Sequence, residues 1–281
     1  MRIVSLLPAA TEIVWALGLG DDLVGVSHAC DFPPALVGRP VATRPSGAGA
    51  GARRSTGAVD AAALLALRPD VVFAGAGPRD WNAGPDATVV VLAPASREGI
   101  FHAIATVGAM TYAEDEAVGL VEILRERLAD VEEVAAGRRD DGHHAPRVVV
   151  LDGLDPLSSA GLWVPEQVRR AGGWEVLGSD GEPSAPATWE AIAEVDPEML
   201  LLVPHGMHLG EVTRAWVATP RPRFWSEIQA VRRGRVFALD ASAYFSRPGP
   251  RVIDGIEILA EIFDPAAFVD LAPAGSWVPV R

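Results

Sequence analysis

The sequence contains no lysine, and all 24 of its Lys and Arg positions are arginine. Without lysine the chain has no amine for a Schiff base and no P-loop lysine, which excludes these two kinds of catalytic site. Cysteine is nearly as scarce, because Cys30 is the only one among 281 residues. A single cysteine forms no internal disulfide and builds no cluster of several thiolates around a metal ion.

Long apolar runs are also absent. The apolar stretch near the N-terminus, residues 3–10, is interrupted by Pro8 and continues into an amphipathic pattern. We therefore expect the first strand and helix of the fold here and no signal peptide, and we find no segment with the length of a membrane span. As it stands, the chain is expected in the cytoplasm; if a leader has been removed, it is expected in the periplasm or outside the cell.

The balance of charge excludes one class of partner. Asp and Glu number 37 against 24 arginines, so the formal net charge is −13. Phosphate backbones and anionic membrane surfaces repel such a chain, and we expect no nucleic acid partner. The hydrophobic content of 49% is typical of a globular protein, and the length suits one large domain or two lobes.

Short apolar runs that alternate with helical patterns predict an α/β fold. The runs are rich in Val and Leu and nearly continuous, as expected for parallel strands covered on both faces. We predict strands at 2–7, 23–27, 71–75 and 88–93, and helices at 10–18, 60–69 and 97–110. A segment rich in Gly and Ala, residues 42–56, is predicted to be a loop.

Residues 111–139 carry the longest helical pattern. Their apolar residues recur at spacings of three and four, acidic residues occupy the first turn, and Arg138 and Arg139 occupy the last turn. We expect one long helix that connects two lobes. The predicted domains are an N-terminal α/β lobe at 1–110, this helix at 111–139, and a C-terminal α/β lobe at 140–281.

The α/β pattern starts again after the long helix. We predict strands at 147–152, 199–204 and 235–240, and helices at 164–173, 188–197, 224–234 and 251–263. Residues 65–75 and 192–204 share the plan of a helix end, a turn with proline and a strand, which indicates a weak internal repeat.

Open α/β sheets bind ligands at the carboxyl ends of their strands. The residues that follow the predicted strands are therefore the candidates for a ligand site. They are Pro8, His28, Asp31, Trp81, Trp163, His205, Tyr244, Phe245, Arg247 and Arg251. Large rings suit a large flat ligand, and guanidinium groups suit its polar edge. The alternative for each ring taken singly is packing beneath a loop.

Catalytic and metal-binding patterns are weak. His28, Cys30 and Asp31 are competent metal ligands, but in an extended segment Asp31 points away from the other two, and we predict no metal site. His205 and His208 have no third donor nearby and are expected in a solvated turn. No glycine-rich phosphate loop follows a strand, and neither G-x-S-x-G nor H-E-x-x-H occurs. We predict neither an enzyme nor a bound cofactor.

Four stretches resemble the cobalamin- and iron-siderophore-binding proteins of ABC transporters, most closely their cobalamin-binding-protein-like branch. They occur in the same order as in that family and together reach from one end of the chain nearly to the other. These stretches are residues 2–34, 64–75, 162–173 and 242–262.

The resemblance implies two Rossmann-like α/β lobes joined by a single long rigid helix, with a ligand cleft between the lobes and little lobe closure. The aromatic pair that precedes the family's Pro-Arg element corresponds to Tyr244 and Phe245. Another aromatic contact of the family falls on Ala29, beside His28.

The resemblance also implies a surface glutamate in each lobe that docks on a membrane permease. The matching position is Glu190 in the second lobe and Ala62 in the first, where Asp60 is the nearest acid. The departure at Ala62 weakens the expectation of an ABC permease partner more than the expectation of ligand binding.

We therefore predict a substrate-binding protein that captures a large metal chelate for ABC-transporter uptake, with cobalamin or a related corrinoid as the first choice of ligand. Haem or an iron-siderophore is the alternative ligand. An intracellular sensor or enzyme on the same scaffold is the alternative function, and it requires that His28, Asp31 and Arg247 converge in a small polar pocket.

Overall fold

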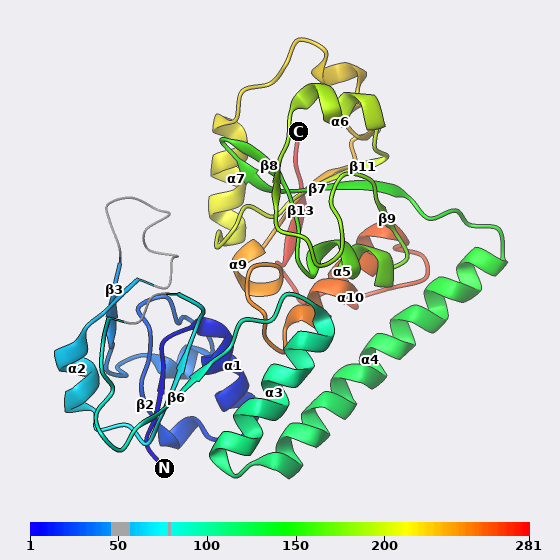
Figure 1. Ribbon diagram of the computed structural model, residues 1–281. Helices are drawn as coiled ribbons and strands as arrows, with labels where there is room; N and C mark the ends of the chain where they lie inside the picture. Colours follow the sequence, from blue (N-terminus) through cyan, green and yellow to red (C-terminus); the bar gives the residue numbers. More distant parts are fainter. Residues whose placement is uncertain (46–56, 78–79) are drawn as a thin grey trace. The chain divides into compact units, whose positions relative to one another are not determined.

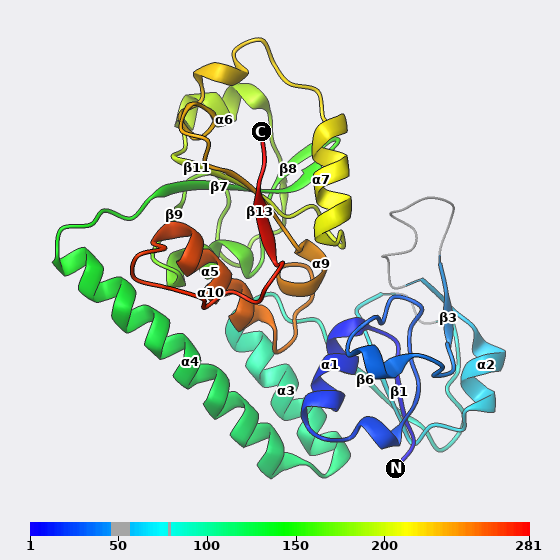
Figure 2. The same ribbon diagram turned by 180° about the vertical axis from the view of Figure 1, so that it is seen from behind.

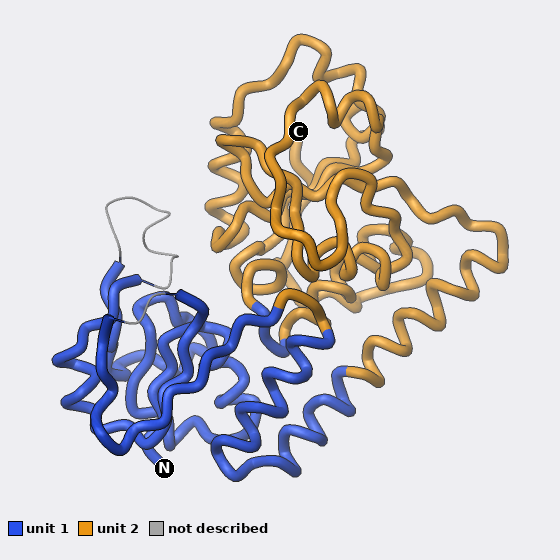
Figure 3. Tube along the Cα trace, in the orientation of Figure 1, with its two compact units in different colours: residues 1–94, 98–124, 248–250 blue, residues 95–97, 125–247, 251–281 orange. Residues whose placement is uncertain are grey.

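The computed structural model describes residues 1–45, 57–77 and 80–281. Most of the predicted loop at 42–56, namely residues 46–56, lies outside the described residues. The chain forms two compact units, coloured separately in Figure 3. Unit 1 comprises Met1–Pro94, Glu98–Leu124 and Pro248–Pro250, and unit 2 comprises Ala95–Arg97, Arg125–Arg247 and Arg251–Arg281.

Unit 1 contains a parallel sheet with the strand order β2-β1-β5-β6 (Figure 1). All of β1 and β5 is buried, as the nearly continuous apolar runs predicted, whereas the edge strand β6 is partly exposed. The strands are β1 (Ile3–Ser5), β2 (Leu23–Gly25), β5 (Val71–Ala74) and β6 (Thr88–Val91). The four strands predicted for this half of the chain are confirmed, each shorter than expected.

The helices of unit 1 begin where local chemistry favours a start. Helix α1 begins at Pro8, whose fixed φ angle suits the first turn. The carboxylate of Asp60 accepts a hydrogen bond from the backbone N–H of Ala63 (3.1 Å) and caps helix α2. The remaining elements are α1 (Pro8–Ala16), η1 (Gly20–Asp22), η2 (Pro34–Leu36), the antiparallel pair β3 (Thr43–Arg44) and β4 (Ala58–Val59), α2 (Ala61–Ala66) and α3 (Arg97–Thr111).

The predicted long helix is confirmed as α4 (Glu114–Asp140), which spans 27 residues. Its part up to Leu124 belongs to unit 1 and its part from Arg125 belongs to unit 2. The apolar spacing is only partly used for burial, because Leu128 is 5% exposed while Val118 is 56% exposed. The chain therefore passes from one unit to the other within a continuous helix.

Unit 2 contains a larger, mixed sheet with the order β10-β8-β7-β11-β12-β13, and β9 pairs with β7 beside this path. Strand β13 adds an antiparallel edge next to β12 (red in Figure 2). The strands are β7 (Arg147–Leu154), β8 (Leu157–Ser159), β9 (Trp174–Glu175), β10 (Ala185–Pro186), β11 (Met199–Leu202), β12 (Val236–Leu239) and β13 (Trp277–Pro279). Strands β8, β10 and β13 were not predicted.

The two sheets repeat one topology. The parallel strands of unit 2 run β9-β7-β11-β12, which is the order β2-β1-β5-β6 of unit 1 with the second strand outermost. Strands β5 and β11 are the third strand of each unit and lie in the two stretches predicted to be a repeat. Each is preceded by a residue with positive φ before proline, Arg68 (44°) and Asp196 (38°). The weak internal repeat is confirmed at the level of topology.

The helices of unit 2 depart from prediction in two places. The single helix predicted at 224–234 is wrong, because Ile228 adopts an extended ψ of 130° between η3 and α8. Helix α7 was not predicted. The elements are α5 (Val164–Arg170), α6 (Trp189–Val195), α7 (Leu209–Ala218), η3 (Trp225–Glu227), α8 (Gln229–Arg232), α9 (Ala241–Tyr244) and α10 (Val252–Phe263).

Candidate functional site

Strands β11 and β12 of unit 2 end at the same edge of the sheet, since they are parallel and Leu202 is in register with Ala238. We call this edge the carboxyl edge of unit 2. His205 follows β11, and its backbone N–H donates to the carbonyl of Asp152 in β7 (2.8 Å). The turn after β11 therefore lies against the end of β7, where the sequence predicted ligand-binding residues.

Three of the predicted side chains meet at this edge. Trp163, His205 and Phe245 line a cavity of about 50 Å³. The other residues around it are Asp152, Gly161, Leu162, Val164, Ser184, Val203 and Ser246. A cavity of this size holds a few water molecules at most and is far too small for a macrocycle.

The rings in this cavity are more deeply buried than a ligand-facing rim requires. Trp163 is 5% exposed and Phe245 is 3% exposed, so packing beneath a loop describes both rings better than exposure on a rim. The indole Nε1 of Trp163 is buried and has no hydrogen-bond partner among the described residues. A buried donor of this kind is costly unless a water or a ligand accepts from it.

Tyr244 is half-buried and ends the short helix α9, which the sequence treated as part of a loop. Its carbonyl accepts a hydrogen bond from the Nε2 of Gln167 (3.1 Å), which also donates to the carbonyl of Val252 (2.8 Å). The guanidinium carbon of Arg251 lies 5.6 Å from the centre of the Tyr244 ring. One side chain of α5 thus fixes the backbone on both sides of this predicted site.

His208 is not in a solvated turn, so that expectation is wrong. It is the N-cap of α7, in a capping box with Glu211, and its Nδ1 lies 3.1 Å from both carboxylate oxygens of Asp240. Burial acts to raise the pKa of Asp240, but hydrogen bonds from His208 and from the backbone N–H of Ala243 hold this pKa below its ordinary value. The carboxyl edge of unit 2 therefore keeps an ionised carboxylate.

Arg247 lies in the same network. One of its Nη atoms donates to the Oγ of Ser242 (3.0 Å), and the Oγ of Ser246 accepts from the backbone N–H of Gly206 (2.8 Å). The segments after β11 and β12 are thus joined by side-chain hydrogen bonds. The predicted residues of unit 2 belong to one connected edge of the sheet.

In unit 1, His28 is held in place by a neighbouring strand. Its Nδ1 lies 2.7 Å from the Oγ1 of Thr43, which also accepts from the backbone N–H of His28 (2.9 Å). A Cβ atom on Gly57 would overlap the carbonyl of Arg44 and approach the His28 ring, so this turn requires glycine. The imidazole orientation is therefore fixed by its surroundings.

The other predicted residues of unit 1 lie in different surroundings. Pro8 is half-buried at the start of α1, and Asp31 is exposed. Trp81 is half-buried and packs on the hydrophobic cluster that includes Leu64 and Ala83, so much of its ring serves the core. Pro248–Pro250 also belong to unit 1, where Gly249 lies close to Ala9 of α1.

The two proposed docking positions prove to be structurally equivalent. Glu190 is the second residue of α6 after the cap Thr188, and Ala62 is the second residue of α2 after the cap Asp60. Both are exposed. Asp60 does not replace the missing acid, because its carboxylate caps α2 and also pairs with Arg44.

Sequence reasoning missed residues that act through others. Gln167, Thr43 and Ser246 hold the backbone or side chains of predicted site residues, yet each is an ordinary polar residue in its local pattern. Asp152 had a usable signal, since it ends the predicted strand at 147–152. Its carboxylate accepts from the Oγ of Ser158 (2.6 Å) and from Ser184.

Two further searches of the described residues gave no candidates. In residues 1–45, 57–77 and 80–281, no group of three or more His, Cys, Asp and Glu side chains is placed to hold a metal ion. Within the same residues, no helix combines the length and the hydropathy that crossing a bilayer requires.

Comparison with known proteins places these observations in a family. The family described as periplasmic binding protein matches residues 3–243. The chain is 26% identical over 275 residues to the uncharacterized ABC transporter substrate-binding lipoprotein YvrC of Bacillus subtilis, covering 95% of this chain and 81% of the relative. It is 28% identical over 272 residues to the vitamin B12-binding protein of Vibrio cholerae, covering 91% and 86%.

A solved structure has the same fold. The periplasmic heme-binding protein from Pseudomonas aeruginosa matches with a TM-score of 0.74 at 23% identity, over 100% of this chain and 95% of that protein. Similarity at this level of identity shows the fold alone. The predicted α/β architecture with two sheet-containing lobes is confirmed.

Proposed function

Because this chain belongs to the periplasmic binding protein family, we propose that it captures a large metal chelate for an ABC transporter, with cobalamin or a related corrinoid as the first choice. The observation that carries this choice is similarity over nearly the whole chain to a protein named for vitamin B12 binding. The family and the named relatives are binding proteins, which agrees with the lack of a catalytic motif in the sequence.

The chemistry of the carboxyl edge of unit 2 supports a large ligand with a flat face and polar edges. The half-buried ring of Tyr244 offers a face for stacking, and its backbone is fixed by Gln167. Arg247 and Arg251 supply guanidinium groups that suit the amide arms of a corrinoid. Trp163 adds a buried N–H whose hydrogen bond is not made within the described residues.

Haem is the second candidate, because the chain carries the groups that haem requires. Haem iron is bound by His or Tyr side chains in many proteins, and His28, His205 and Tyr244 are all among the predicted site residues. Arginines would pair with the two propionate groups of haem. A corrinoid brings its own lower ligand and places no such demand on the protein.

A titration of purified protein with cyanocobalamin and with hemin, each to about 100 μM, tests the proposal. Corrinoid binding predicts a change in corrin absorbance together with quenching of tryptophan fluorescence. Haem binding predicts a shifted Soret band that changes again in Tyr244→Phe or His205→Ala. No spectral change with either ligand would contradict the proposal.

The two tyrosines of the chain provide a matched pair of variants. Tyr244→Ala removes the ring proposed to stack on the ligand and should weaken chelate binding by about tenfold or more. Tyr112→Ala removes a ring that is 84% exposed and follows α3 in unit 1, and it should leave binding unchanged. Equal effects of the two variants would remove Tyr244 from the site.

Docking on an ABC permease is the second part of the proposal. Glu190 is exposed in the first turn of α6, free to meet an arginine of a permease, whereas Ala62 offers no charge at the equivalent position of α2. Glu190→Arg should weaken binding to the permease reconstituted in nanodiscs and leave chelate binding intact, and Ala62→Glu should strengthen docking. Unchanged docking in both variants would contradict this part.

A further inference from the structure

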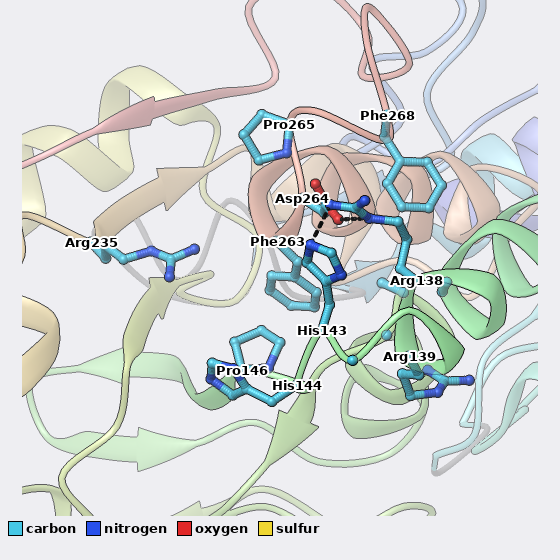
Figure 4. Close-up of a pocket in the computed structure, with 14 residues that line it drawn as sticks. Arg138, Arg139, His143, His144, Pro146, Arg235, Phe263, Asp264, Pro265 and Phe268 are labelled. Carbon is cyan, nitrogen blue, oxygen red and sulfur yellow. Dashed lines mark hydrogen bonds and ion pairs between the residues drawn. The ribbon is translucent and has the colours of Figure 1, made fainter.

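A second pocket of unit 2 lies at the end of α4, where it meets the ends of α5 and α10. Its volume is about 370 Å³, within the range of small-molecule sites. It is lined by Ala135, Arg138, Arg139, Gly142, His143, His144, Pro146, Ala171, Gly172, Arg235, Phe263, Asp264, Pro265 and Phe268 (Figure 4). Pro146 directly precedes β7 and Arg235 directly precedes β12, so the pocket lies at the amino ends of these parallel strands, opposite the carboxyl edge.

The lining is basic, although the protein as a whole has a net charge of −13. It contains three arginines and two histidines, and Asp264 is the only acid among these lining residues. Asp264 is already paired with Arg138, whose Nε lies 2.6 Å from its Oδ2 and whose Nη2 lies 2.8 Å from the Nε2 of His143. His144 is paired with Glu198 at 3.0 Å, outside the lining.

Two arginines remain without an acidic partner among the described residues, Arg139 and Arg235. Arg235 is half-buried, and burial lowers the pKa of its guanidinium. A cation withdrawn from water without a hydrogen-bonded anion is energetically unfavourable. An anionic ligand would supply the missing partner. Figure 4 shows Arg235 on one side of the pocket and Arg139 on the other.

The space between the two arginines is apolar. Phe268 is 7% exposed and Phe263 is half-buried, and both rings line the pocket together with two prolines and two alanines. Simple inorganic anions would leave these rings uncovered. An aromatic or aliphatic body between two acid groups would contact the rings and still reach both cations.

We infer that this pocket binds a small organic dianion, with an acid group at Arg235, a second at Arg139 and an apolar middle on Phe263 and Phe268. The site is separate from the proposed chelate site and does not depend on it. Arginines also stabilise helix C-terminal ends by complementing the macrodipole, and the test must distinguish this role from binding.

Calorimetric titration with terephthalate, benzoate and neutral terephthalamide tests the inference. Terephthalate should bind saturably, benzoate about tenfold more weakly, and terephthalamide not at all. Arg139→Ala should reduce the affinity for terephthalate about tenfold and leave benzoate unchanged. Arg235→Gln should abolish binding of both. Circular dichroism would confirm that each variant is folded.

The matched control is Arg214→Ala on α7, which removes the same charge from an exposed position outside the pocket and should change no affinity. No saturable binding of terephthalate up to about 10 mM would overturn the inference. So would an equal loss in Arg214→Ala, since that would indicate general charge attraction. If Arg235→Gln does not fold, the exposed Arg139 decides the question alone. Cyanocobalamin and hemin binding in Arg139→Ala should match the unaltered protein, which separates this result from the fate of the proposed function.

Discussion

Arg127 of α4 holds Glu257 of α10 through two parallel hydrogen bonds, 2.9 Å from Nε to Oε1 and 2.5 Å from Nη2 to Oε2. The same Nη2 lies 2.5 Å from the Oδ1 of Asp254. Burial acts to lower the pKa of Arg127, but the two carboxylates hold it above the ordinary value. This fork joins the second half of α4 to the body of unit 2.

Loss of this fork should destabilise unit 2. Arg127→Ala leaves the carboxylate of Glu257, which is 7% exposed, without its cation. Removal of one partner from a buried pair costs about 3–5 kcal/mol, and because the Arg127 side chain is 36% exposed we expect about 2–3 kcal/mol. Urea unfolding followed by circular dichroism measures the change. Arg214→Ala, at an exposed position, should stay within about 0.5 kcal/mol, and equal losses in both variants would contradict the role assigned to the fork.

Gly255 of α10 is required by close packing and not by backbone conformation. A Cβ at this position would overlap the Nε2 of Gln167 and lie 2.7 Å from the carbonyl of Tyr244. Gly255→Ala gains about 1 kcal/mol of helix propensity, but overpacking costs about 1–3 kcal/mol, and the Gln167 hydrogen bonds are displaced. We expect a net loss of stability on thermal unfolding and weaker chelate binding through Tyr244.

Gly119 of α4 is the matched control for this prediction. No atom lies within 4 Å of a Cβ at Gly119, so Gly119→Ala should gain stability by up to about 1 kcal/mol. The two substitutions are chemically identical and should have opposite signs. A gain in both would mean that Gln167 and Tyr244 move aside at little cost.

The long helix could be predicted from sequence because several local signals agreed over the same residues. Acidic residues at Glu114–Glu116, arginines at the other end and regular apolar spacing all indicated a helix. The burial of its seam could not be predicted, since Val118 and Leu128 carry the same pattern but only Leu128 has a neighbour to cover it. Amphipathic spacing shows which face is apolar, and tertiary contacts decide which part of that face is buried.

Helix α7 escaped prediction because its start is atypical. Its N-cap is His208 instead of Ser, Thr, Asp or Asn, and Gly210 lies in the first turn. The acidic N3 residue of the capping box, Glu211, was present in the sequence but carried little weight without a usual cap. A local rule therefore failed where a histidine also serves a buried carboxylate, that of Asp240.

The candidate site was predicted by position and misjudged in depth. The rule that ligands bind at the carboxyl ends of strands selected Trp163, His205 and Phe245, which do line one cavity. The sequence could not show that two of these rings are almost fully buried, because a residue after a strand can point to solvent or beneath its own loop. Tyr244 remains the half-buried ring of the adjacent pair.

A buried carboxylate in β9 predicts a dependence of stability on pH. Burial raises the pKa of Glu175 to about 7, although backbone N–H groups of Leu177, Gly178 and Val150 donate to it and oppose the rise. With a folded-state pKa above the unfolded value, the folded protein binds the proton more tightly. This contribution to stability is fully present below about pH 4.5 and is lost as the pH rises through about 7.

The comparison with Glu175→Gln isolates this contribution. The amide is neutral at every pH, although it turns one donor toward a backbone N–H and so lowers stability throughout. Relative to this variant, the unfolding free energy of the unaltered protein should fall by about 2–3 kcal/mol between about pH 5 and pH 8. Urea unfolding at several pH values measures it. A constant difference would mean that the three N–H groups hold the carboxylate ionised.

Trp163 separates a role in folding from a role in binding. Its ring is 5% exposed and packs at the start of α5, but its buried N–H has no partner among the described residues. Trp163→Phe removes this donor and keeps most of the packing, so the loss of cavity contacts is partly offset and the unfolding free energy should change by less than about 1.5 kcal/mol. If the ligand accepts from the indole N–H, the affinity for the chelate should fall about tenfold or more. Equilibrium unfolding and titration with cyanocobalamin, carried out on the same preparation, give the two numbers. A large loss of stability with unchanged affinity would assign Trp163 to the core alone and leave Tyr244 as the aromatic contact of unit 2.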